Sequence, residues 1–192
     1  LPIELAILPY IESNYDPFSI SPSGAVGIWQ FMPRTGRLYE LNKSWWNEDR
    51  HDPFKSTQAA VGYLKYLYQR FDEDIYLTIA AYNAGPSLVD RRINQNKRKG
   101  EKTDFWSLNL PSQTKNYVPK YIALRELILN SDKYGVKLPN IPYEDVVKKI
   151  NGKINKVNRY INQNEFDKLK VHVDNQPVLT KELVTAMYEG MD

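Results

Sequence analysis

Cysteine is absent from this 192-residue sequence, and histidine occurs only twice, at His51 and His172. The lack of cysteine excludes a disulfide scaffold, a thiol nucleophile and a zinc site with sulfur ligands. Two histidines cannot build a three-histidine metal centre, and a serine–histidine triad would have to use one of them. The sequence therefore implies neither a metal ion nor an organic cofactor.

Long apolar runs are also missing: no stretch of about 18 apolar residues occurs, so the sequence predicts no transmembrane helix. Neither a targeting signal nor an internal repeat is recognisable. Hydrophobic residues make up 42% of the chain and charged residues 26%, which is ordinary for a globular protein and argues against a wholly disordered one. The length predicts one domain, or one domain with an appendage.

The net charge is only +3, yet the basic residues gather in one segment. Residues 91–102 read RRINQNKRKGEK, with six basic residues and one acidic residue. Such a segment could face an anionic polymer, namely nucleic acid, a membrane surface or an acidic cell-wall glycan. Equally, it could be a solvated helix end followed by a loop.

Hydrophobic spacing predicts a mainly α-helical domain over residues 1–131. Asp52 is placed to cap one helix, Gly85 to end another in a left-handed conformation, and Pro9 to kink the first or remove one of its bonds. The expected helices cover residues 3–15, 33–41, 53–71, 75–83, 86–98 and 112–130. The remaining residues, 132–192, predict a small appendage with helices near 143–150 and 180–189 and a strand at 170–173.

Glu12 is the first candidate for chemistry. On the predicted helix its neighbours are Leu8 and Tyr15, and an apolar setting desolvates a carboxylate and raises its pKa. A carboxylic acid that keeps its proton near neutral pH can give it to a leaving oxygen. The residues alone also allow a surface glutamate at a helix end.

Glycoside hydrolysis usually needs a second carboxylate, and the sequence offers no convincing one near Glu12. Asp16 precedes Pro17, so we expect it to end the helix and to bind loop amides. The remaining acidic candidates lie in less defined segments: Glu40, Glu48 and Asp49. A plain hydrolase is therefore disfavoured, unless the substrate supplies its own nucleophile.

The segment GAVGIWQFMP, residues 24–33, carries side chains suited to a cleft. Its glycines allow close backbone approach, and Gln30 offers both a donor and an acceptor. Trp29 and Phe31 have flat faces that suit sugar rings or a core, and we expect at least one of them to be core.

Two further segments hold polar side chains beside small or apolar residues. AYNAG, residues 81–85, could project Tyr82 and Asn83 into a cleft, or could be a simple helix end with residues chosen for the turn. Tyr117, in QTKNYVP, would need a hydrogen-bond partner if buried, and that partner could be a carboxylate.

Taken together, these segments resemble a known family. ES at 12–13, GAVGIWQFMP at 24–33, AYNAG at 81–85 and QTKNYVP at 113–119 are similar in order and spacing to lytic murein transglycosylases of the soluble-lytic-transglycosylase type. The likeness is strongest to the membrane-bound lytic transglycosylase D branch and covers residues 1–139. It implies a lysozyme-like helical catalytic domain, as in goose-type lysozyme, followed by an extension of unknown role at 140–192.

The resemblance implies a reaction with one catalytic residue. Glu12 matches the acid/base that protonates the glycosidic oxygen between N-acetylmuramic acid and N-acetylglucosamine. The acetamido group of the muramic sugar assists at C1. Glu12 then takes the proton of that sugar's C6 hydroxyl, so a 1,6-anhydro ring closes and no water is consumed. The substrate would thus replace the missing second carboxylate.

Five substrate-binding roles follow from the same resemblance. By motif position, Ser13 and Gln30 are expected to bind sugar substituents near the scissile bond. Tyr82 and Asn83 are expected to orient the acetamido group. Tyr117 is expected to form a hydrogen bond near Glu12 or the developing cation.

The resemblance further implies peptidoglycan strands as the partner and a periplasmic or cell-envelope location. That branch has a signal or lipid anchor upstream, so membrane attachment, including to the outer membrane, would need a segment outside this sequence. Three alternatives remain: a muramidase that uses water, a wall-binding module without catalysis, and a nucleic-acid binder. The last has only the charge of residues 91–102 in its favour.

Overall fold

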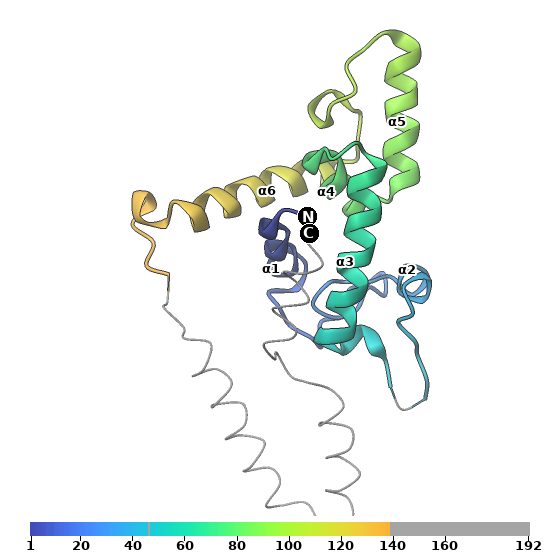
Figure 1. The fold of residues 1–192 in the computed structure, drawn as a ribbon, viewed down its shortest axis with the longest axis vertical. Helices are drawn as coiled ribbons and strands as arrows, with labels where there is room; N and C mark the ends of the chain where they lie inside the picture. Colours follow the sequence, from blue (N-terminus) through green and yellow to red (C-terminus); the bar gives the residue numbers. More distant parts are fainter. Residues whose placement is uncertain (46, 139–192) are drawn as a thin grey trace, which may run out of the picture.

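The computed structural model describes residues 1–45 and 47–138, and these residues form a mainly α-helical domain, as predicted (Figure 1). No strand occurs within these two ranges, where β-pairing is limited to three isolated antiparallel bridges. The α-helices are α1 (Leu8–Ser13), α2 (Pro33–Leu38), α3 (Pro53–Arg70), α4 (Ile75–Ala84), α5 (Pro86–Lys99) and α6 (Ser112–Leu129). The 3-10 helices are η1 (Ile3–Ile7), η2 (Asp49–His51), η3 (Phe105–Ser107) and η4 (Ser131–Tyr134).

The N-terminal helix differs from the predicted single helix over 3–15. Its first part is the 3-10 helix η1, and α1 ends at Ser13 because Asn14 and Tyr15 both adopt positive φ, 53° and 59°. Pro9 does not kink an established helix: it lies in the first turn of α1, where its missing N–H needs no partner. Glu12 consequently stands in the last turn of a short helix.

Side-chain caps fix the N-terminal ends of the central helices α3 and α4. Asp52 accepts hydrogen bonds from the backbone N–H groups of Phe54 and Lys55, which confirms the predicted cap of α3. Asp74 caps α4 in the same way. Gly85 has the expected positive φ of 84°, but its ψ of 138° is extended, so the prediction of a left-handed helical conformation was wrong in this respect. The turn leads directly into α5 at Pro86.

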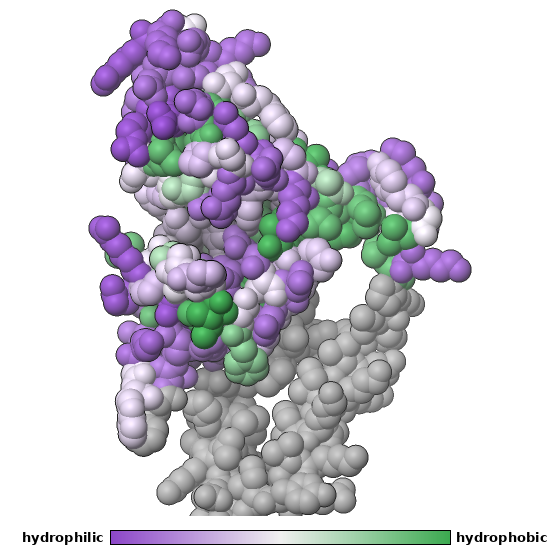
Figure 2. All heavy atoms as spheres, turned by 180° about the vertical axis from the view of Figure 1, so that it is seen from behind, coloured by the Kyte–Doolittle hydropathy of each residue, from purple (hydrophilic) through white to green (hydrophobic). Residues whose placement is uncertain are grey.

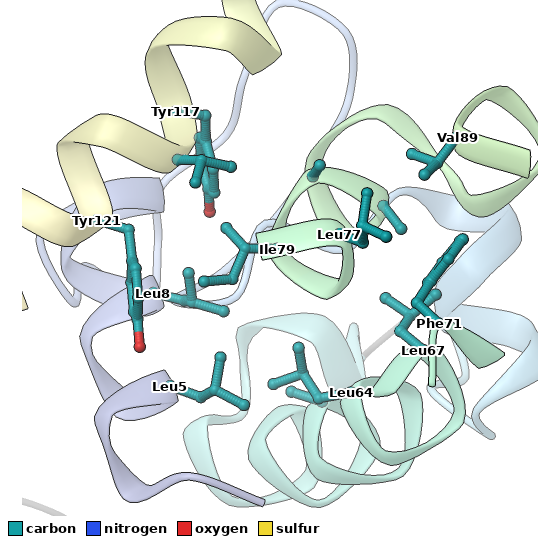
Figure 3. Close-up of a cluster of buried hydrophobic side chains, with 14 of the residues drawn as sticks. Leu5, Leu8, Leu64, Leu67, Phe71, Leu77, Ile79, Val89, Tyr117 and Tyr121 are labelled. Carbon is teal, nitrogen blue, oxygen red and sulfur yellow. The ribbon is translucent and has the colours of Figure 1, made fainter. Parts of the chain in front are cut away.

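Helix α4 lies at the centre of the domain. It is apolar on every side, which is typical of a helix surrounded by others, and α3, α5 and α6 pack against it. Its buried residues are Leu77, Thr78, Ile79, Ala80 and Ala81. Figure 3 shows Ile79 between Leu8 of α1 and Tyr117 of α6. Fully burying such a side chain contributes about 1.5–3 kcal/mol, so α4 is a firm support for the residues at its end.

Trp29 and Phe31 are both core residues, each 3% exposed. This confirms the expectation that at least one of them belongs to the core. The indole N–H of Trp29 donates to the hydroxyl of Thr57 on α3 at 2.8 Å. This bond satisfies the one polar group of a buried tryptophan. The loop that carries Gln30 is therefore anchored on α3 by the residues on either side of it.

The predicted elements at 143–150, 170–173 and 180–189, and the whole extension 140–192, lie outside the described residues. Among the described helices, none combines the length and the apolar character needed to cross a membrane. All the residues of the candidate site lie within the described ranges.

Candidate active site

Glu12 and Tyr117 meet across the domain although 105 positions separate them. The Tyr117 hydroxyl, carried by α6, donates to Glu12 Oε1 at 2.6 Å. Burial raises the pKa of Glu12 above its ordinary value, while the Tyr117 hydrogen bond and the nearby Lys120 oppose that rise. Burial likewise raises the pKa of Tyr117 well above its ordinary value, with the Glu12 charge adding to it, so the phenol stays a neutral donor.

Gln30 lies in a tight turn of the 24–33 segment, with a φ of 49°. Its Nε2 donates to the carbonyl oxygens of Gly27 at 2.8 Å and Ser19 at 3.2 Å. Both amide hydrogens are therefore used within the protein. Among the described residues no group donates to Oε1, so this oxygen is the part of Gln30 that can accept a hydrogen bond from a ligand.

Tyr82 and Asn83 occupy the end of α4. The Tyr82 hydroxyl donates to the carbonyl oxygen of Trp29 at 2.7 Å, which ties α4 to the Gln30 segment. Asn83 Oδ1 accepts a hydrogen bond from the buried Thr114 of α6 at 2.9 Å. This bond orients the amide and leaves Nδ2 as a donor without a partner in the described part of the chain.

The Ser13 hydroxyl is directed to backbone carbonyl oxygens. Its hydroxyl lies 3.2 Å from the carbonyl oxygen of Pro9 and 3.0 Å from that of Ile28, and can donate to either. The side chain therefore links the end of α1 to the loop before Gln30. Ser13 is not among the residues that line the cleft described next.

A cleft of about 380 Å³ brings four of the six predicted site residues together: Glu12, Gln30, Tyr82 and Asn83. Tyr117 stands behind Glu12 as its hydrogen-bond donor. Glu12 is the only acidic residue that lines this cleft within the described residues. Asp16, as expected, binds a loop amide instead, since its Oδ1 accepts from the N–H of Phe18 at 2.9 Å.

Sequence reasoning missed several polar residues of the cleft wall, among them Tyr63 of α3 and Gln113 of α6. The Tyr63 ring lies 5.6 Å from the Tyr82 ring, and burial raises the pKa of Tyr63 to about 12. No described group accepts from its hydroxyl, which is therefore a neutral donor at the cleft. Gln113 stands inside the quoted QTKNYVP segment, and only its motif position could have pointed to it.

Arg50, which supports the cleft from outside its lining, was also not revealed by the sequence. Its guanidinium is 5% exposed and donates to the carbonyl oxygens of Gly24 at 3.0 Å and Phe31 at 2.8 Å. The remaining side of the fork pairs with Glu48 at 2.7 and 2.9 Å. Arg50 thus holds both ends of the loop that presents Gln30, because a buried arginine needs acceptors on all sides.

The described residues include no group of three His, Asp or Glu side chains arranged to hold a metal ion. Chemistry at the cleft would rest on one carboxylic acid that can release and regain a proton. Around it stand neutral donors and acceptors, on Asn83, Gln30 and Tyr63, which suit an uncharged polar ligand such as a sugar with amide and hydroxyl groups.

Comparison with known proteins gives the class of this domain. The family described as the transglycosylase SLT domain matches residues 1–105, which is more than half of the chain. The chain therefore belongs to the SLT transglycosylase family, as the four motifs indicated.

Two individual relatives and one solved structure agree with this assignment. The chain is 48% identical over 139 residues to membrane-bound lytic murein transglycosylase D of Escherichia coli K12, covering 72% of this chain and 31% of that protein. It is 29% identical over 116 residues to the soluble lytic murein transglycosylase of Escherichia coli K12, covering 58% of this chain and 18% of that protein. The crystal structure of the 70 kDa soluble lytic transglycosylase from Escherichia coli superposes with a TM-score of 0.51 at 25% identity, covering 68% of this chain and 22% of that one. The chain thus spans about a third or less of the length of these relatives.

Proposed function

We propose that this chain carries the catalytic domain of a peptidoglycan lytic transglycosylase. The observation that carries the proposal is the hydrogen bond of 2.6 Å between Glu12 and Tyr117. Within the described residues, Glu12 is the only acidic residue that lines the cleft. The bond that it cleaves joins N-acetylmuramic acid to N-acetylglucosamine in the glycan strand. The relatives named as lytic murein transglycosylases support that choice.

Each step can be assigned to a bond and a proton. Glu12 gives its proton to the glycosidic oxygen, and the bond from that oxygen to C1 of the muramic sugar breaks. The acetamido carbonyl oxygen of the same sugar forms a temporary bond to C1. The C6 hydroxyl oxygen then displaces it and gives its proton to Glu12. The acid is restored, the product is a 1,6-anhydro ring, and no water enters the reaction.

The surrounding residues have matching proposed roles. The free Nδ2 of Asn83 orients the acetamido carbonyl of the muramic sugar, with the Tyr82 ring as a wall beside it. The free Oε1 of Gln30 accepts from a sugar hydroxyl or amide. Because the Ser13 hydroxyl is directed to backbone carbonyls, we propose that it positions α1 rather than binding sugar.

We also propose the domain division, the binding partner and the location of the protein. We propose that residues 1–139 form the catalytic domain and 140–192 an extension whose role is open; the residues matched by the family, 1–105, lie within the first part. The partner is the glycan strand of peptidoglycan, so the protein acts in the cell envelope, in the periplasm. Attachment of the full-length protein to a membrane, including the outer membrane, is the finer proposal, and that relative is named membrane-bound.

Product analysis tests the reaction directly. Purified sacculi are digested with the 192-residue chain, and the released muropeptides are identified by mass spectrometry. We expect 1,6-anhydro ends, which are lighter by one water molecule than reducing ends. Reducing ends would instead assign the chain to water-using muramidases. An absence of any release, with sacculi still bound, would make it a wall-binding module.

Tyr117→Phe is expected to shift the pH dependence of the reaction. The Tyr117 hydrogen bond lowers the pKa of Glu12, so its removal lets that pKa rise further. Glu12 must be protonated to act as an acid, and activity falls as it ionises. The alkaline limb of the profile of kcat/KM against pH should therefore move to higher pH, while activity on the plateau falls.

The matched control is Tyr121→Phe, which makes the same change one turn later on α6. Tyr121 is buried in the core and has no hydrogen bond to Glu12. This variant should keep the wild-type profile. A shift of similar size in both variants, or a shift of the Tyr117→Phe limb to lower pH, would contradict the role given to the Tyr117 hydroxyl.

A further inference from the structure

A groove of about 460 Å³ runs along α5, outside the cleft. Arg91 and Arg98 line it two helical turns apart, which is about 10 Å along the axis. Val89 and Asn96, each two positions earlier, point into the domain, so the two arginines lie on the opposite, solvent-facing side of α5. Both are exposed, and neither has an acidic partner or a hydrogen-bond acceptor among the residues that the structure describes.

A row of side-chain contacts connects this groove to the cleft. Tyr63, on the cleft wall, stacks on Tyr66 of the same helix, with ring centres 6.4 Å apart and planes within 14°. Arg70 lies 5.7 Å above the Tyr66 ring and donates to its hydroxyl at 2.9 Å. Arg70 also pairs with Asp90 at 2.6 Å, and Asp90 lines the groove. The row therefore leads without interruption from α3 to α5; in Figure 1, α5 begins near the upper end of α3 and continues beyond it.

The chemistry of this row changes along its length. At the cleft end it presents the flat tyrosine rings, which suit sugars. At the far end Arg70 already neutralises Asp90, so the charges of Arg91 and Arg98 are uncompensated. A guanidinium binds a carboxylate through two parallel hydrogen bonds. In Figure 2 the end of the molecule formed by α5 and the segment after it is mostly hydrophilic.

A glycan strand that carries acidic peptide branches presents its groups in the same order. Its sugars would lie in the cleft and against the tyrosine rings, and the peptide branches would extend beyond them. We propose that the groove of Arg91 and Arg98 on α5 is a second binding region, which takes the free carboxylates of the peptides attached to the strand held in the cleft. This inference rests on the proposed function, because that function supplies the strand.

The test compares two substrates and one double variant of the 192-residue chain, Arg91→Glu/Arg98→Glu. One substrate is purified sacculi, and the other is glycan strands from which an amidase has removed the peptides. We expect the variant to release product from the peptide-bearing substrate roughly threefold to tenfold more slowly at low substrate, because two exposed charge contacts are lost. Its rate on the peptide-free strands should equal that of the wild type. The difference should shrink at high salt.

Lys97→Glu/Lys102→Glu is the matched control. It changes the charge of the same basic segment by the same amount, but both lysines lie outside the groove. This control should stay near the wild type on both substrates. If both double variants release product equally slowly, the effect depends only on net charge. If the arginine variant is equally slow on both substrates, the peptide is not what the groove binds. Either result overturns the proposal, as would an Arg91/Arg98-dependent binding of DNA with unchanged digestion of sacculi.

A binding measurement separates this proposal from the proposed function. In a Glu12→Gln background, co-sedimentation with sacculi reports binding without turnover. If the wild-type chain releases no product, the proposed function fails. If the arginine variant nevertheless shows weaker, peptide-dependent co-sedimentation, the groove assignment stands. Unchanged co-sedimentation overturns it whether or not the chain is active.

Discussion

Glu12→Gln is expected to reduce the release of anhydro muropeptides by about 10²–10⁴-fold, the usual contribution of general acid–base catalysis. Glutamine keeps the size of the side chain and an oxygen that can accept the Tyr117 hydrogen bond. It has no proton to give to the leaving oxygen. In the described part of the chain no other acidic residue lines the cleft, so none is placed to substitute. Initial rates of product release from purified sacculi measure the loss.

The same variant should not be less stable, which separates lost chemistry from lost folding. Burial raises the pKa of Glu12 in the folded chain above its ordinary value of 4.5. The folded state then binds more protons than the unfolded state, so the contribution of Glu12 to stability falls as the pH rises from 4.5 through the folded-state pKa. Above its ordinary pKa Glu12 therefore lowers the stability of the fold, and neutral glutamine removes that effect.

We therefore expect Glu12→Gln to melt at or above the wild-type temperature at pH 7, with the difference disappearing in acid. Thermal unfolding monitored by circular dichroism at both pH values measures this. An inactive variant with a clearly lower melting temperature would show that the residue is structural. A variant with nearly full activity would show that Glu12 is not the acid.

Gly27→Ala is expected to destabilise the domain by about 2–5 kcal/mol. Gly27 has a φ of 82°, and a Cβ added there would lie 1.8 Å from the carbonyl oxygen of Arg50. That oxygen belongs to the backbone and cannot rotate away. The Gln30 loop or η2 must therefore move, and the bonds from the Arg50 guanidinium to this loop would be broken with it. Chemical denaturation of the two proteins measures the difference.

Gly24→Ala provides the control for backbone strain alone. Gly24 lies in the same loop with a φ of 84°, but an added Cβ would meet nothing within 4 Å. This change should destabilise the domain by only about 1–2 kcal/mol, the energy of placing an alanine at positive φ. If the two substitutions have the same effect, the contact between Gly27 and Arg50 does not limit this position.

Local sequence signals were sufficient for most of the fold. Helices with a capping aspartate or a proline in the first turn, such as α3 after Asp52 and α5 at Pro86, were predicted within a residue or two of their observed bounds. The N-terminal helix was predicted too long, because Asn14 and Tyr15 continue the apolar spacing. In the structure both residues adopt positive φ, and the Tyr15 hydroxyl donates to the carbonyl oxygen of Ala6, nine positions earlier, a contact that helical spacing does not reveal.

The sequence predicted the residues of the site less completely than it predicted the fold. Motif order could indicate Glu12, Gln30 and Asn83, since each stands in a segment of unusual composition. It could not indicate Arg50, whose main-chain acceptors lie 19 and 26 positions away, because no local pattern distinguishes a buried arginine from a solvated one. For Ser13 the motif suggested a sugar contact, whereas its hydroxyl bonds to Pro9 and Ile28 in the folded chain.

The hydrogen bonds from Arg50 to the Gln30 loop fix the backbone of one cleft wall independently of the side chains that would select the ligand. Because the guanidinium grips main-chain oxygens, the course of this wall does not depend on which side chains face the opening. Met32 and Thr35 line the cleft and make no side-chain hydrogen bond within the described residues. Exchanging them can change which saccharides enter while the acid and its tyrosine stay where they are. The side chains at the rim of the cleft can therefore vary without moving Glu12 and Tyr117.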